Sequence, residues 1–227
     1  MNAFYNNLLK GFIETSFVDW PGKIASVVFL PGCSFSCGWC HNRMLLDAPD
    51  KLDTPSFSQV VNRITELKQW VDGIVVTGGE PTIHSCLPEL VGKLNQLAPV
   101  KLDTNGSRPE MLEFLLNAGL LAGVSMDIKA PLETDYYTRV AAVPVDIDQI
   151  KRSIKLILES GLWYEFRTTV LPGMHTREDI ETMEKQLKEL NGGGELKRPL
   201  KLQAFKPGEH LPEPWCSKPA VDLDSFR

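Results

Sequence analysis

The sequence predicts an α/β fold, a partial (β/α)6 TIM-like barrel with parallel strands. Short apolar runs rich in β-branched residues recur about six times along the 227 residues, as in buried parallel strands. Segments with apolar residues at helical spacing separate these runs. Because parallel strands need a crossover, usually a helix, this alternation indicates a parallel sheet covered by helices. A doubly wound open sheet is the structural alternative.

The expected elements follow one another in regular order. Strands are expected at 24–30, 73–77, 100–103, 123–129, 164–170 and 200–205. Helices are expected at about 56–71, 87–97, 109–118, 147–158 and 180–190. Thr54 or Ser56 can cap the first of these helices, and Pro109 suits the first turn of the third. Residues 1–23 and the tail from Leu211 show no clear element.

The chain is expected to form a single domain over residues 1–227. No internal repeat or low-complexity linker divides it, and a hydrophobic content of 43% allows a substantial core. The core is expected at about 12–208, after an N-terminal lead-in at 1–23 and before an irregular C-terminal tail at 209–227.

Composition limits the classes of function. The formal net charge of −5, without a basic stripe, argues against nucleic-acid binding. No apolar run approaches the length of a transmembrane helix, so no membrane insertion is expected. The N-terminus lacks a basic region followed by an apolar one, which favours a cytoplasmic location.

Three cysteines follow the first expected strand within one short loop. Cys33, Cys37 and Cys40 are separated by three and two residues, so a tight loop can wrap them around one metal centre. A 4Fe–4S cluster usually takes four cysteine thiolates. Here the loop offers three, and an open fourth iron suggests substrate chemistry rather than plain electron transfer.

Other uses of this loop are less consistent with the sequence. Cys37-Gly38-Trp39-Cys40-His41 fits the pattern for haem attachment, but that leaves Cys33 unexplained. A Cys3His zinc site is possible by ligand count, although structural zinc cysteines usually come as two separated pairs. Disulfides would need an export route. Cys86 and Cys216 are expected to be reduced thiols outside the cluster.

Polar and glycine-rich segments follow the other expected strands. Gly78-Gly79-Glu80 follows the second strand, Asp103-Thr104-Asn105 ends the third, and Asp127 and Lys129 end the fourth. In parallel α/β folds these strand ends converge on one site, so the segments are expected near the cysteines. The alternatives are plain turns and loop caps.

The cysteine spacing, with Trp39 just before the third cysteine, resembles the signature of the radical S-adenosylmethionine (radical SAM) superfamily. The resemblance implies that three thiolates hold a 4Fe–4S cluster and that S-adenosylmethionine binds the fourth iron. Reductive cleavage then gives methionine and a 5′-deoxyadenosyl radical. Gly78, Gly79 and Glu80 resemble the element that holds the ammonium of the cofactor.

Further segments resemble the glycyl-radical-enzyme activases. These are Asp19-Trp20-Pro21-Gly22, Cys40-His41-Asn42-Arg43, Asp103-Thr104-Asn105-Gly106, Asp127-Ile128-Lys129 and Arg167 with Leu171-Pro172-Gly173. The resemblance places Asp103, Thr104, Asn105, Asp127 and Lys129 around the cofactor, with the aspartates and Thr104 near a monovalent cation. It implies that Arg167 faces the cofactor and that Trp39 packs on its adenine. A structural salt bridge for Arg167 and a core position for Trp39 are the alternatives.

The full lead-in is most similar to the long form of anaerobic ribonucleoside-triphosphate reductase activating proteins, which are related to pyruvate formate-lyase activases. The resemblance implies a glycyl radical enzyme as partner, such as that reductase, and an electron donor such as flavodoxin or ferredoxin. Trp20 replaces a glycine usual in formate-lyase activases, and Gln203 and Phe205 stand where those enzymes have a cofactor-facing histidine.

Two other functions stay open at this point. One is a radical SAM enzyme acting on a small molecule, such as a deazapurine-forming synthase. The other is a non-catalytic metal-binding module, which would leave Glu80, Asp103 and Asp127 without a shared task. His84, His175 and His210 are expected on the surface or in loops.

Overall fold

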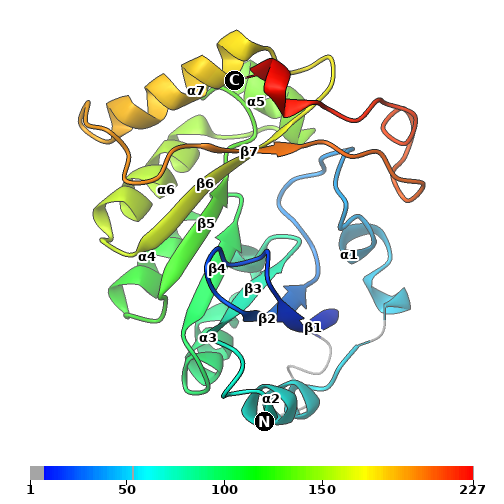
Figure 1. Cartoon of the computed structure of the whole chain (residues 1–227), viewed down its shortest axis with the longest axis vertical. Helices are drawn as coiled ribbons and strands as arrows, with labels where there is room; N and C mark the ends of the chain where they lie inside the picture. Colours follow the sequence, from blue (N-terminus) through cyan, green and yellow to red (C-terminus); the bar gives the residue numbers. More distant parts are fainter. Residues whose placement is uncertain (1–7, 53, 227) are drawn as a thin grey trace. The chain divides into compact units, whose positions relative to one another are not determined.

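The computed structural model describes residues 8–52 and 54–226 (Figure 1). Its strands are β1 Gly11–Ser16, β2 Ala25–Leu30, β3 Gly73–Gly78, β4 Val100–Thr104, β5 Gly123–Asp127, β6 Trp163–Val170 and β7 Lys201–Ala204. In the described part of the chain they form one seven-stranded sheet with the order β1-β2-β3-β4-β5-β6-β7. The pairs β2/β3, β3/β4 and β6/β7 are parallel, and β1 runs antiparallel to β2 at one edge.

Helices connect most of these strands. The α-helices are α1 Met44–Asp47, α2 Phe57–Glu66, α3 Leu87–Asn95, α4 Pro109–Asn117, α5 Thr134–Ala141, α6 Ile147–Glu159 and α7 Arg177–Leu190. Short 3-10 helices are η2 Pro49–Lys51, η3 Pro81–Ile83 and η4 Leu223–Phe226. The predicted α/β class with a mostly parallel sheet is confirmed, and all six expected strands are present as β2–β7.

Three elements that the sequence did not reveal are β1, α1 and α5; α1 has only four residues and buries Leu45. The middle of β1 is exposed, so it lacks the apolar alternation of a half-buried strand. Helix α5 spans eight residues and buries only Tyr137, Val140 and Ala141, which is too short a pattern to stand out. The tail from Leu211, for which no element was expected, contains η4.

The chain divides into two compact units. Unit 1 comprises the described residues of Met1–Ser34, Asn42–Thr104 and Glu110–Val124. Unit 2 comprises those of Phe35–His41, Asn105–Pro109 and Ser125–Arg227. The expectation of a single domain stays a prediction.

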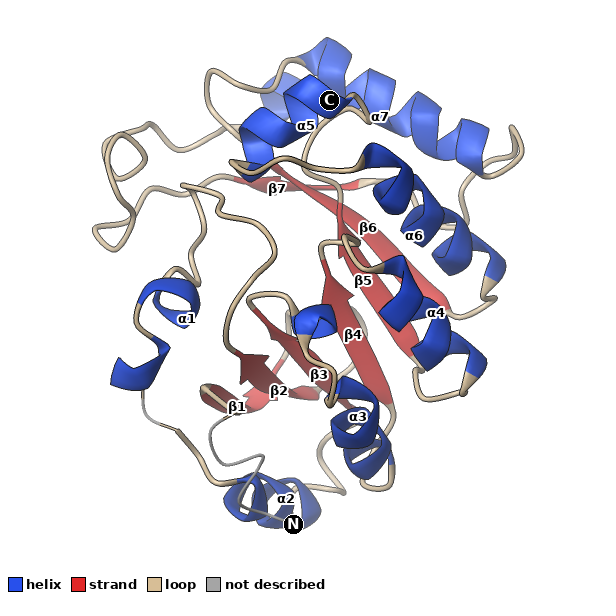
Figure 2. Ribbon diagram, turned by 180° about the vertical axis from the view of Figure 1, so that it is seen from behind, coloured by secondary structure: helices blue, strands red, loops and turns tan. Residues whose placement is uncertain are grey.

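Unit 1 is built around strands that are buried on both faces. Nearly every residue of β2, and every residue of β4, is buried, as expected for strands covered on both sides. Helix α3 packs on β3 and β4, as Figure 2 shows. Helix α2 begins with a capping box in which Ser56 and Gln59 bond to each other's backbone, which confirms Ser56 as its cap. It ends at Glu66, five residues before the expected end.

Unit 2 has its own core around β6. Its longest helices, α6 and α7, pack against each other and bury Ile150, Ile154, Met183 and Leu187. Asp146 caps α6, and Thr176 forms a capping box with Asp179 at the start of α7. Among the described residues, none of the helices has the length and apolar character needed to cross a membrane.

Trp20 of the lead-in fills a gap that Gly73 leaves in unit 1. The indole is fully buried, and a Cβ added at Gly73 would lie 2.6 Å from its ring. Lys23 places its ammonium 4.2 Å from the indole centroid. The tryptophan that replaces the family's usual glycine is therefore a core residue matched to a glycine on the neighbouring strand.

We predict that Trp20→Ala lowers the free energy of unfolding by about 3–5 kcal/mol, because it opens a large cavity in the core. Denaturant unfolding measures the loss. Trp70→Ala is the matched control, since Trp70 is 71% exposed and its removal should change stability by no more than about 0.5 kcal/mol. Equal effects of the two substitutions would contradict the assignment of Trp20 to the core.

Candidate active site

The three cysteines lie in the loop that leaves the end of β2. Gly32 makes the turn into the loop with a φ of 71°, and its N–H donates to the Leu45 carbonyl at 2.9 Å. Within the loop, the Cys40 N–H donates to the Cys37 carbonyl at 3.2 Å. Cys33 belongs to unit 1, whereas Cys37 and Cys40 belong to unit 2.

None of the five cysteines is joined in a disulfide. Burial raises the pKa of Cys37 to about 11, against the opposing effect of the Lys129 ammonium. In the described residues no three His, Cys, Asp or Glu side chains are gathered as a metal site. The donor set still fits an iron–sulfur cluster, because three thiols on one short loop are the soft ligands that such clusters take.

The C-terminal tail contacts the cysteine loop in unit 2. A Cβ added at Gly38 would lie 2.6 Å from Nε1 of Trp215. The Trp215 ring packs edge-on against Phe205, with 5.7 Å between centroids. His210 and His41 share a hydrogen bond of 3.2 Å between Nε2 and Nδ1. Gln203 and Phe205 occupy the place where formate-lyase activases have a cofactor-facing histidine. His210 lies beyond β7.

Gly78, Gly79 and Glu80 run close to the segment that leads into the cysteine loop. Gly79 donates its N–H to the Leu30 carbonyl at 2.9 Å, and Glu80 donates its N–H to the Gly32 carbonyl at 2.8 Å. A Cβ at Gly79 would lie 1.7 Å from the Gly32 oxygen. The glycine is therefore required by the approach of two backbones.

The structure brings Glu80 and Thr104 together inside unit 1. Glu80 is fully buried, and its Oε1 accepts hydrogen bonds from the N–H and hydroxyl of Thr82 and from the Thr104 hydroxyl at 2.7 Å. Three hydrogen bonds thus orient a fully buried carboxyl group. Such a group suits an organic cation.

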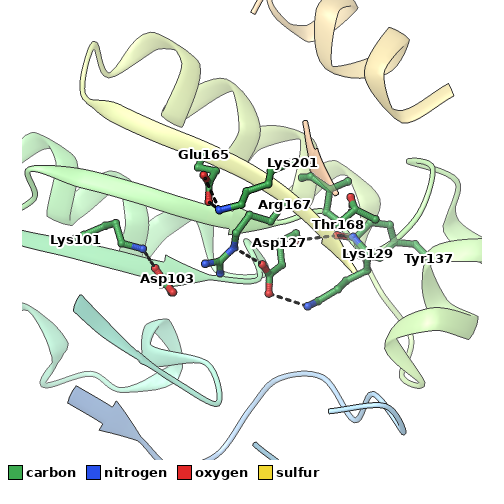
Figure 3. A network of polar contacts seen from close by, with 10 residues as sticks. Lys101, Asp103, Asp127, Lys129, Tyr137, Glu165, Arg167, Thr168 and Lys201 are labelled. Atoms are coloured by element: carbon green, nitrogen blue, oxygen red, sulfur yellow. Dashed lines mark hydrogen bonds and ion pairs between the residues drawn. The ribbon is translucent and has the colours of Figure 1, made fainter. Parts of the chain in front are cut away.

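Asp103 pairs with a lysine that the sequence did not single out. Lys101 is completely buried, and its ammonium donates to Oδ1 of Asp103, the pair drawn in Figure 3. The two residues are separated by one position on β4, so their side chains share a face of the strand. A lysine two positions before Asp103 in an apolar strand was the available signal.

Asp127 is the centre of a second charged cluster, in unit 2 (Figure 3). Its Oδ1 accepts from Arg167 Nε at 3.0 Å, and its Oδ2 accepts from Lys129 Nζ at 2.9 Å. Burial alone would raise the pKa of Asp127, but the two cations outweigh burial and hold that pKa well below its ordinary value. Arg167 thus has the carboxylate partner that its place in an apolar strand requires.

Trp39 and Asn105 occupy buried positions in unit 2. The Lys129 ammonium lies 4.8 Å from the centroid of Trp39, whose Nε1 donates to the Val140 carbonyl at 3.4 Å. Only 6% of Trp39 is exposed. Oδ1 of Asn105 accepts from the Ser107 N–H at 3.0 Å and shapes the turn after β4.

The three histidines expected on the surface or in loops lie outside the helices and strands, but one of them is buried. His175, expected on the surface or in a loop, does lie in a loop, but it is 5% exposed and bonds to backbone groups of Leu171 and Lys129. His84 is partly buried and bonds to the Pro31 carbonyl at 2.8 Å, while His210 is exposed. Tyr137 and His175, like Lys101, carried no motif that would mark them.

The sequence pattern of the radical SAM superfamily matches residues 27–187, which is more than half of the chain. The chain belongs to the radical SAM superfamily. This membership implies a 4Fe–4S cluster and S-adenosylmethionine as cofactors.

Individual relatives refine this membership. A Methanocaldococcus jannaschii protein, provisionally named a glycyl-radical enzyme activating enzyme, is 32% identical over 189 residues, covering 80% of this chain and 76% of the relative. A provisionally named GTP 3′,8-cyclase from Methanococcus aeolicus is 30% identical over 148 residues, covering 62% of this chain but only 47% of the relative. The crystal structure of Streptococcus suis SuiB shares the fold, with a TM-score of 0.57 at 15% identity over 80% of this chain and 39% of SuiB.

We predict that Gly79→Ala lowers the free energy of unfolding by about 1–3 kcal/mol, because the new Cβ overlaps the Gly32 carbonyl and forces the two backbones apart. Gly92→Ala, on α3, is the control. Its nearest neighbour to an added Cβ is 3.8 Å away, so this change should stabilise the protein by about 0.5–1 kcal/mol. Chemical denaturation of both variants decides, and an unaffected Gly79→Ala would contradict the close approach.

Asp127→Asn should lower stability at pH 7 by about 1.5–3 kcal/mol, because two cations lose a charged acceptor. Since the folded pKa of Asp127 is depressed, its contribution is complete above the unfolded pKa of about 3.9 and is lost as the pH falls below it. Denaturant unfolding at pH 7 and pH 3 tests this. A difference between wild type and variant that did not shrink at pH 3 would argue against the ion-pair assignment.

Proposed function

We propose that this radical SAM protein is an activase that generates a glycyl radical on a partner enzyme. The observation that carries the proposal is the loop of three reduced cysteines after β2, joined through backbone hydrogen bonds to the segment that ends in the buried Glu80. The partner that we favour is anaerobic ribonucleoside-triphosphate reductase, and the electron donor a flavodoxin or ferredoxin. The similarity to a relative named as an activating enzyme, over most of both chains, supports this choice.

The thiolates of Cys33, Cys37 and Cys40 would hold the 4Fe–4S cluster. When bound, the cluster supplies one low-potential electron that cleaves S-adenosylmethionine into methionine and a 5′-deoxyadenosyl radical. The protein's part is to hold the cofactor in one orientation and to keep water away from it. Reduced thiols of this kind also fit a cytoplasmic location.

In unit 1, Glu80 would accept the ammonium of the cofactor. Thr82 and Thr104 fix the carboxylate through hydrogen bonds, so it is oriented before the ligand arrives. Gly78 and Gly79, which have no side chains, would let the backbone approach the cofactor closely. Asp103, with Lys101 on the same strand, would add to the polar lining of unit 1. Asn105, which belongs to unit 2, would contact the cofactor from the turn after β4.

In unit 2, Lys129 and Arg167 would supply donors to an anionic group of the cofactor, and Asp127 holds both cations in place. Trp39, whose ring already contacts the Lys129 ammonium, would also contact the adenine of the cofactor. We do not extend the proposal to a monovalent cation, because Asp103 and Asp127 each already pair with a cationic side chain.

A small-molecule reaction is the second candidate function, favoured by the similarity to a GTP 3′,8-cyclase. That similarity spans less than half of the relative, whereas the match to the activating enzyme covers about three quarters or more of both chains. A non-catalytic metal-binding module would not explain the buried, oriented carboxylate of Glu80.

The test is an anaerobic assay of the protein reconstituted with iron and sulfide. After reduction, addition of S-adenosylmethionine should yield 5′-deoxyadenosine, and Cys33→Ala, Cys37→Ala and Cys40→Ala should each abolish it, because each removes a cluster ligand. Cys86→Ala and Cys216→Ala are the controls and should retain the product.

Electron paramagnetic resonance then separates the two candidate functions. With the reductase present, an activase should produce a stable glycyl radical on it. Deoxyadenosine without a radical on any glycyl radical enzyme, but with turnover of GTP, would favour the small-molecule reaction. A bound zinc or haem without deoxyadenosine would refute both.

A further inference from the structure

Lys129 is held through both of its backbone groups by two buried aromatic side chains. Its N–H donates to the hydroxyl of Tyr137 at 3.1 Å, and its carbonyl accepts from Nε2 of His175 at 2.9 Å. The Tyr137 hydroxyl also approaches the Asp127 carbonyl, to which it donates at 3.5 Å. Tyr137 is fully buried, and Figure 3 shows it beside Lys129.

The protonation of His175 is fixed by its second partner. Nδ1 accepts the N–H of Leu171 at 3.0 Å, so the ring proton must lie on Nε2, where it points to the Lys129 carbonyl. Burial lowers the pKa of His175 and favours this neutral form. The imidazole thus links the backbone after β5 to the backbone after β6 through two hydrogen bonds.

The helix that carries Tyr137 also holds the cysteine loop. At the end of α5, the Ala141 carbonyl accepts the Ser36 N–H at 3.0 Å, and the Val140 carbonyl accepts Nε1 of Trp39. The Phe35 ring packs edge-on against Tyr137, with 6.4 Å between centroids. One short helix therefore contacts both the loop of Cys37 and Cys40 and the peptide of Lys129.

Packing alone does not explain the Tyr137 hydroxyl. A phenylalanine would give the same edge-on contact with Phe35, whereas a buried hydroxyl costs free energy unless it is hydrogen-bonded. Here its hydrogen bonds go to the Asp127–Lys129 segment. The side chain of Lys129 is only 11% exposed and lies between Asp127 and the face of Trp39, so its direction depends on where its peptide is fixed.

We propose that Tyr137 and His175 are positioning residues for cofactor binding, which fix the peptide of Lys129 and thereby aim its ammonium. The proposal rests on the proposed function, because it takes Lys129 as a contact of S-adenosylmethionine. Neither residue touches the cofactor in this proposal. Their effect passes through Lys129 and, by way of α5, through Trp39.

The test compares two adjacent tyrosines of α5 in the reconstituted protein. Tyr137→Phe removes the hydroxyl bonds to the Lys129 N–H and to the Asp127 carbonyl. Tyr136→Phe, the matched control, removes hydroxyl bonds to Asp179 and to the Met174 carbonyl. Tyr137→Phe should raise KM for S-adenosylmethionine about threefold to tenfold, with a smaller change in kcat, as expected for one lost hydrogen bond. Tyr136→Phe should leave KM unchanged.

A second readout needs no cofactor. Amide hydrogen exchange of Lys129 should accelerate about tenfold in Tyr137→Phe and in His175→Gln, but not in Tyr136→Phe. Equal midpoints of denaturation for the two tyrosine variants would show that neither has unfolded.

The possible outcomes are distinct. If wild type forms deoxyadenosine but Tyr137→Phe matches Tyr136→Phe in KM and in exchange, the positioning role is refuted. If wild type forms no deoxyadenosine, the proposed function fails, and the role of Tyr137 and His175 in cofactor binding fails with it. Faster exchange with unchanged KM would refute the link to the cofactor.

Discussion

The close approach of two backbones, from the end of β3 to the end of β2, is the constraint on which the rest of unit 1 depends. Hydrogen bonds from Gly79 and Glu80 to Leu30 and Gly32 leave no space for a side chain at Gly79. The approach sets the start of the cysteine loop and the place of Glu80 by the same two bonds. The carboxyl group of Glu80 and the thiol of Cys33 are therefore positioned by the same backbone contact.

Each aspartate of the proposed site is paired with cationic side chains of its own unit before any cofactor binds. Asp103 is matched by the buried Lys101, and Asp127 by Arg167 and Lys129. Buried ion pairs contribute little net stability, because desolvation offsets attraction, but they hold side chains in one arrangement. A site that must receive a zwitterionic sulfonium gains from such fixed groups of both signs, since they need not reorganise when the ligand arrives.

The strands were predictable because buried parallel strands are continuous apolar runs, which need no knowledge of their neighbours. The ends of these strands also carried the recognisable polar segments. Helix α5 was not predictable, because its stability comes from contacts of Tyr137, Val140 and Ala141 with other parts of unit 2 rather than from its own pattern. The sequence indicated that Arg167 needs an acceptor, but not that Asp127, 40 positions away, provides it.

His175 shows the same limit from the other side. A lone histidine in the turn after β6 carries no local signal of burial, and its role emerges only when the ends of β5 and β6 lie together. Single-residue patterns therefore identify the ligands of the site more readily than the side chains that support them.

The tail has a practical consequence for handling the protein. Trp215 lies against Gly38 and His210 bonds to His41, so residues 210–215 support the loop that carries Cys37 and Cys40. Truncations before His210 would remove both contacts with that loop. A sample cleaved after Gly208 would keep all three cysteines of the loop but lose the side chains that support Cys37 and Cys40 from the tail.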